Sequence, residues 1–112
     1  MTTPAEWIFA LSGIEADLPD APAPRRHYPL RHGTMRAGLY APRGADPQTP
    51  HTQDEIYIIV SGTGVFAKNG ERRPFKPQDL IFVEAGAEHR FESFSDDFST
   101  WVVFWGPEGG EG

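Results

Sequence analysis

The chain has no cysteine, so no disulfide framework can hold it together. It also has no apolar run of about 20 residues, the length that a membrane-spanning helix needs. Its N-terminus lacks the basic and apolar regions of a signal peptide. These absences predict a cytoplasmic protein with no membrane partner.

Basic residues are in the minority: the chain has 10 Lys and Arg but 16 Asp and Glu, which gives a net charge of -6. A nucleic-acid partner would require a stripe of basic side chains along its phosphate backbone. The chain offers only the short pairs Arg25-Arg26 and Arg72-Arg73. We therefore expect no nucleic-acid partner.

The 112 residues suffice for one domain, and the 12 Gly and 11 Pro suit many tight turns. Short runs rich in β-branched and aromatic residues predict strands within residues 31–41, 56–60, 65–68, 80–83, 89–92 and 100–105. The first of these is expected to be broken or bulged at Gly38. Asn69-Gly70 is the strongest hairpin signal. The spacing predicts an all-β sandwich or barrel.

The barrel is expected over residues 31–106, after an N-terminal arm of residues 1–30 and before a flexible tail of residues 107–112. Within the arm, Thr3 is a candidate N-cap for a short helix. Trp7, Ile8 and Leu11 would then share one helix face. Trp7 is expected to be a packing anchor for the arm rather than a lid over the barrel mouth. The rest of the arm is expected to be a linker or an edge strand.

Two ligand-type side chains precede the apolar run of residues 56–60, which we expect to be buried. His51 and Glu55 are an even number of residues apart, so a continuous strand would point both to one face. Asp54 would point to the opposite face and is expected at the surface. An imidazole and a carboxylate on a buried face suggest a metal ion, because a buried carboxylate is costly unless it is paired. His89, after a second short strand and a turn, is the candidate third ligand.

These two stretches together resemble the paired motifs of the cupin superfamily. In the first motif, His51 matches the second histidine, Glu55 the glutamate and Gly62 the closing glycine. In the second motif, Gly86 and His89 match. The resemblance covers roughly residues 34–105 and implies a double-stranded β-helix, or jelly-roll, barrel with a short N-terminal arm or helix.

The chain also departs from the motifs. The first histidine of the usual His-x-His pair is Thr49, so one of the four usual metal ligands is absent. Other motif positions are occupied by Gln78 for Gly, Glu84 for Pro and Ser93 for Asn, and Gly44 lies one position from the opening glycine. What remains is a set of two histidines and one carboxylate, His51, Glu55 and His89.

Such a set suits a divalent transition metal: Fe, Mn, Ni, Zn or Cu. Three protein ligands leave coordination positions open for water or substrate, as in catalytic sites. Residues that could line the pocket are Gln48, Thr49, Gln53 and Tyr57. No catalytic residue is assigned.

The function that these features favour is a small metal-binding cupin that holds a small organic ligand inside the barrel. A dioxygenase, an isomerase and a lyase are the enzyme classes considered. The alternative is a metal-free barrel that binds or senses a small ligand or serves a structural role. The apolar last strand, together with the resemblance, predicts a homodimer.

Overall fold

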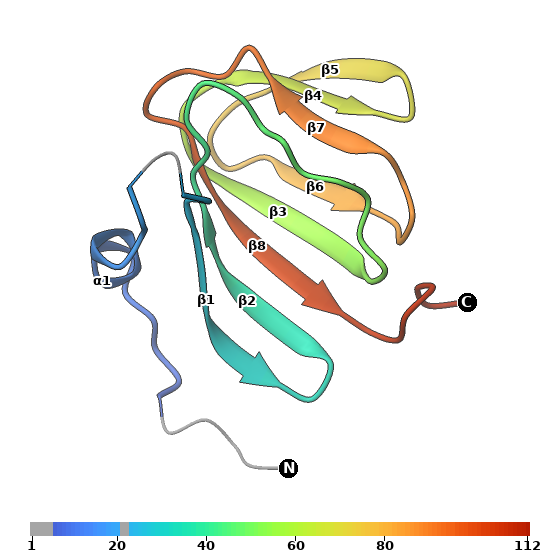
Figure 1. Cartoon of the computed structure of the whole chain (residues 1–112), viewed down its shortest axis with the longest axis horizontal. Coiled ribbons are helices and arrows are strands. Elements are labelled where there is room, and N and C mark those ends of the chain that lie inside the picture. Colours follow the sequence, from blue (N-terminus) through green and yellow to red (C-terminus); the bar gives the residue numbers. More distant parts are fainter. Residues whose placement is uncertain (1–5, 21–22) are drawn as a thin grey trace.

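The computed structural model of the protein describes residues 6–20 and 23–112. These residues form helix α1 (Leu11–Ala16) and strands β1 (Arg26–His32), β2 (Met35–Tyr40), β3 (Asp54–Ser61), β4 (Gly64–Lys68), β5 (Glu71–Phe75), β6 (Leu80–Val83), β7 (His89–Glu92) and β8 (Ser99–Trp105). All strand pairs are antiparallel, in a five-stranded sheet of order β1-β2-β8-β3-β6 and a three-stranded sheet of order β5-β4-β7 (Figure 1). This is the all-β, double-stranded β-helix fold that the sequence predicted.

The core lies between the two sheets and is rich in aromatic rings. Tyr57 of β3 and Phe91 of β7 meet edge to face at 4.8 Å between ring centroids, and Phe91 packs on Phe98 at 4.7 Å. Alternate residues of each strand point inward, as the pleat of a strand requires. Residues 56–60 are therefore not wholly buried, because Ile58 points outward and is exposed.

The first predicted strand is in fact a hairpin. The chain turns after His32, where Gly33 has φ 59°, and β1 pairs with β2. Gly38 lies within β2, opposite the shift in register between His27 and Leu30 of β1, so the irregularity expected at Gly38 is present. The backbone of β1 comes so close there that a Cβ atom on Gly38 would lie 2.0 Å from the His27 carbonyl oxygen. The strand signal and the irregularity at Gly38 are confirmed, but the turn at Gly33 was not predicted.

The helix also differs from the prediction. Thr3 and the start expected there lie outside the described residues. The observed helix begins only at Leu11, and it buries Ile14. Trp7 and Ile8 precede the helix and are 84% and 72% exposed, so Trp7 is not a packing anchor.

The hairpin at Asn69-Gly70 is confirmed. Both residues have positive φ, 49° and 86°, and they join β4 to β5. This conformation is the one that the Asn-Gly pair favours in two-residue hairpin turns.

Asp54 and the C-terminal residues are hydrogen-bonded to each other, and both differ from what the sequence predicted. Asp54 does point away from Glu55, but it is buried rather than at the surface. Its carboxylate accepts hydrogen bonds from the backbone N–H groups of Ala85 and Glu111, each at 2.9 Å, and these bonds lower the pKa of Asp54. The segment expected to be a flexible tail is thus hydrogen-bonded to the first residue of β3.

Among the described residues, no helix combines the length and the apolar character that crossing a membrane would require.

Candidate metal-binding site

Three sequence-distant residues meet between the sheets. His51 lies in the loop before β3, Glu55 points inward from β3, and His89 is the first residue of β7. Each offers one ligand-type atom, and these atoms all lie within 4.8 Å of one another. The His51 carbonyl accepts a hydrogen bond from Gly86 N–H at 2.8 Å, which ties the first motif to the turn before His89. The structure therefore brings the three predicted ligands together.

Glu55 and His89 form the buried floor of this cluster, with 1% and 6% of their surfaces exposed. The Glu55 Oε1 and His89 Nε2 atoms face each other at 3.2 Å, and neither has another partner among the described residues. His89 Nδ1 lies 2.9 Å from the Ala87 carbonyl oxygen, which can only accept a hydrogen bond, so Nδ1 carries a proton. In the neutral ring, the Nε2 lone pair then points at the carboxylate oxygen, and this pair of acceptors requires a cation between them.

A proton on His89 Nε2 would serve as that cation in the absence of a metal ion. Burial disfavours the charged imidazole of His89, but the Glu55 carboxylate and the Ala87 carbonyl outweigh burial and raise the pKa of His89. His51 behaves in the opposite way. Its ring is half-buried against the edge of Phe104, and burial lowers the pKa of His51 because the Glu55 carboxylate offsets only part of the effect. One imidazole of the cluster is thus biased toward the neutral form and the other toward the charged form.

Gln48 places a further oxygen atom, Oε1, beside the cluster. Its Oε1 atom lies 3.1 Å from His51 Nε2, and it accepts a hydrogen bond from the Tyr57 hydroxyl at 3.1 Å. The amide is oriented by Asp46, whose Oδ2 atom accepts a hydrogen bond from Gln48 Nε2 at 2.6 Å. The Gln48 oxygen therefore faces the cluster.

Asp46 is the site residue that reasoning from the sequence missed. It is buried, and besides the Gln48 side chain it accepts hydrogen bonds from the Tyr40 hydroxyl, from Gln48 N–H and from Phe91 N–H. The bond to Gln48 N–H is the local turn that Asp favours two residues ahead, so the sequence carried a weak signal. The hydrogen bonds of Asp46 to β2 and β7 depend on the tertiary fold, so the sequence carried no signal for them.

The predicted pocket residues divide into two groups. Gln48, Thr49 and Tyr57 line a cavity of about 540 Å³ together with His51 and Glu55. Gln53 does not line this cavity, because its amide donates to the carbonyls of Thr34 and Gly106 at 2.9 Å each, and the structure thus corrects its assignment.

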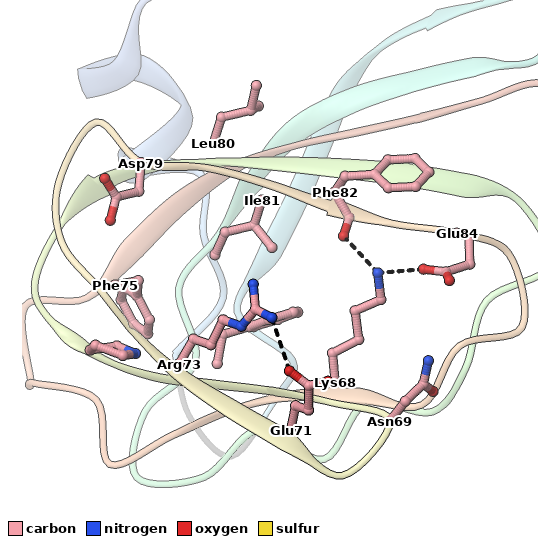
Figure 2. A pocket seen from close by; sticks show the side chains of 12 residues that line it. Lys68, Asn69, Glu71, Arg73, Phe75, Asp79, Leu80, Ile81, Phe82 and Glu84 are labelled. Atoms are coloured by element: carbon pink, nitrogen blue, oxygen red, sulfur yellow. Dashed lines mark hydrogen bonds and ion pairs between the residues drawn. The ribbon is translucent and has the colours of Figure 1, made fainter.

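A second cavity, of about 570 Å³, lies between the β4–β5 hairpin and β6 (Figure 2). Its charged groups are already paired, since Lys68 binds Glu84 and the Phe82 carbonyl, and Arg73 binds Glu71. None of the three candidate metal ligands lines it. The cavity beside His51, which two of the three candidate ligands line, is the candidate site.

Comparison with known proteins agrees with this fold. Residues 38–105 match the family model of the cupin domain. An uncharacterized protein of Streptomyces coelicolor is 38% identical over 81 residues, which cover 70% of this chain and 77% of that protein. The crystal structure of a cupin 2 conserved barrel domain protein from Salinispora arenicola superimposes with a TM-score of 0.70 at 22% identity, covering 92% of this chain and 91% of that one. The chain belongs to the cupin family.

One further relative is a larger protein. The HTH-type transcriptional activator RhaS of Yersinia pestis is 37% identical over 68 residues, which cover 61% of this chain. The match spans only 25% of the length of RhaS. The similarity therefore concerns the barrel and not the whole activator.

Proposed function

We propose that the protein binds a divalent transition metal through His51, Glu55 and His89, and a small organic ligand beside that ion. The observation that carries the proposal is the buried contact of Glu55 Oε1 with His89 Nε2 at 3.2 Å, where neither atom has another partner among the described residues. A buried pair of this kind is stabilised when a cation lies between its members. The donor set of two imidazoles and one carboxylate supplies the ligands that such a cation prefers.

The spacing of the donors also fits an ion. Bonds from a metal to imidazole and carboxylate are about 2.0–2.2 Å long, so neighbouring ligand atoms lie roughly 3 Å apart. The contacts of Glu55 with His89, at 3.2 Å, and of His51 with Gln48, at 3.1 Å, are of this size. Gln48 Oε1 is accordingly the candidate fourth donor, a weaker one than the histidine that Thr49 replaces. Fe, Mn, Ni, Zn and Cu all accept this set.

The residues around the cavity donate hydrogen bonds rather than accept protons. Burial raises the pKa of Tyr28 to about 12 and also raises the pKa of Tyr57 and Tyr40. These hydroxyls therefore stay protonated at neutral pH. Tyr57 and Tyr40 donate to Gln48 and Asp46, which leaves the Tyr28 hydroxyl to orient an oxygen atom of a ligand. A bound ion would act as a Lewis acid that polarises such an oxygen. Dioxygenase, isomerase and lyase chemistry are the reaction classes that we propose, with no catalytic residue assigned.

Metal analysis of the tag-free protein tests this proposal. We expect about one transition metal per chain, and its loss in His51→Ala and His89→Ala, because each substitution removes one of three strong ligands. His32→Ala is the matched control, since His32 lies at the exposed end of β1. Circular dichroism of each variant separates loss of the site from loss of the fold. Absence of metal in the wild type, even after incubation with Fe(II), Mn(II), Ni(II) or Zn(II), would contradict the proposal.

The second candidate function is a metal-free barrel that binds or senses a small ligand. Thr49, in place of a ligand histidine, favours it, and so does the similarity of the barrel to part of the activator RhaS. A substrate screen on metal-loaded protein distinguishes the candidates. Turnover that disappears in His89→Ala but persists in His32→Ala supports the enzyme, whereas binding without turnover supports the sensor.

A further inference from the structure

The cavity beside the candidate metal site is lined mainly by positive charges, although the molecule as a whole is negatively charged. The chain carries a net charge of -6. The cavity is nevertheless lined by Arg25, Arg26 and Arg43, and among the described residues the only acidic one that lines it is Glu55, a candidate metal ligand at the floor. Three guanidinium groups around one opening produce a positive potential that attracts anions.

Two of these arginines are held by the backbone. Arg25 donates to the carbonyls of Ala41 and Pro19, at 2.9 Å and 3.1 Å. Arg43 donates to the carbonyls of Ala41, Pro42 and Phe98. The charges of Arg25 and Arg43 contribute to the positive potential at the rim. Their side chains, however, already donate hydrogen bonds to the backbone, which hold them in place.

Arg26 is different, because its side chain forms no hydrogen bond or ion pair with any residue in the described part of the chain. It lies directly opposite Tyr40 in the pairing of β1 with β2, so both side chains point to the inner face of the sheet. Both also line the cavity. Its charge reaches the cavity, since it opposes the rise in the pKa of Tyr28, which burial causes.

Tyr28 provides a second donor near Arg26. Its ring packs on the edge of Phe104 at 5.9 Å, and Phe104 also contacts His51 at 5.0 Å between ring centroids. The Tyr28 hydroxyl has no hydrogen-bond partner among residues 6–20 and 23–112, and it lines the same cavity. A guanidinium and a phenol are therefore available between the rim and the metal ligands.

We propose that this cavity selects a small organic anion, a carboxylate, and that Arg26 pairs with it while Tyr28 donates a further hydrogen bond. A guanidinium matches a carboxylate in a two-bond geometry that a neutral amide cannot reproduce with the same strength. The cavity, at about 540 Å³, has a volume in the range of metabolite-sized ligands. The inference deepens the proposed function, because the anion is the organic ligand of that same site.

The test compares carboxylates with neutral amides of the same shape. Lactate, succinate and benzoate are titrated beside lactamide, succinamide and benzamide, with inorganic phosphate as a further anion, into Zn(II)-loaded and metal-free full-length protein by calorimetry. We expect at least one carboxylate to bind about tenfold or more tightly than its amide. Arg26→Gln should abolish that preference. Arg31→Gln, which changes the same charge on the same strand at an exposed position outside the cavity lining, should retain it.

The outcomes separate the two proposals. A carboxylate preference that depends on Arg26 supports the inference, whether or not the protein retains metal. The metal content of the protein tests only the proposed function. Equal binding of every carboxylate and its amide, or a preference unchanged in Arg26→Gln, overturns the inference. Phosphate binding in place of every carboxylate would also overturn it. Because Arg26 is exposed, its substitution should leave the melting temperature nearly unchanged, which confirms that the variant is folded.

Discussion

At the scale of single residues, the buried contact of Glu55 with His89 is the feature that most clearly requires a cation. A carboxylate and an imidazole on opposite sheets converge at 3.2 Å, where the ring donates its other proton toward the Ala87 carbonyl. Such a second contact fixes the tautomer of a ligand histidine. The pair thus needs either a proton or a metal ion.

Competition between these two cations predicts a pH dependence of metal binding. The pKa of His89 is raised above its ordinary value of 6.5, so the metal-free protein retains this proton above pH 6.5. The pKa of His51 is lowered, so His51 is already neutral there. Each metal ion that binds must then displace about one proton. The affinity for the metal should therefore fall about tenfold per pH unit below the pKa of His89.

Calorimetry in two buffers of different ionisation enthalpy measures the number of protons released. His89→Ala removes the titrating group along with a ligand, so any residual metal binding should lose this pH dependence. An affinity that does not change between about pH 6 and pH 8 would show that no proton occupies the site.

At the scale of elements, the hairpin of β1 and β2 positions the cavity rim. Gly38 allows the backbone of β1 to lie against β2 next to Tyr28, a cavity-lining residue. The close approach explains why a glycine occupies the interior of a strand, where it would otherwise weaken the sheet.

Gly38→Ala should therefore destabilise the protein. Its Cβ atom would lie 2.0 Å from the His27 carbonyl oxygen, so the strands must separate, at a cost of about 1–3 kcal/mol or more in the free energy of unfolding. Gly13→Ala in α1 is the matched control, because nothing lies within 4 Å of its Cβ position. It should be neutral or stabilise by roughly 0.4–1 kcal/mol. Denaturant unfolding compares the two, and equal stability of Gly38→Ala and wild type would refute the close-approach argument.

At the scale of the whole molecule, the outer face of the large sheet is apolar. Leu80 and Phe82 of β6 are 66% and 51% exposed. The outward positions around them are also hydrophobic: Ile56, Ile58, Trp101, Val103 and Trp105. Exposed apolar patches of this kind mark interaction surfaces. Because two copies with a charge of -6 repel each other, an uncharged face is the surface best suited to self-association.

We propose that this face forms a symmetric homodimer interface. Leu80→Glu should convert a dimer into a monomer, since it buries a charge twice in a two-fold interface. Ile8→Glu is the control, because Ile8 is equally hydrophobic and 72% exposed but precedes α1. Light scattering after size exclusion gives the mass. A wild-type mass of one chain would contradict the dimer.

The amino-acid sequence alone determined the all-β fold, the hairpin at Asn69-Gly70 and the metal-ligand candidates His51, Glu55 and His89. The fold and the hairpin follow from turn chemistry and the two-residue period of strands, which act between neighbouring residues. The ligand candidates follow from that period and from the resemblance of two separate motifs to those of the cupins. The tertiary structure decided that Asp46 binds the Phe91 N–H group, that Gln53 lies outside the cavity and that the last residues bind Asp54. The reason is physical: these contacts join residues up to 57 positions apart, and strand register and sheet closure, rather than local propensity, bring them together.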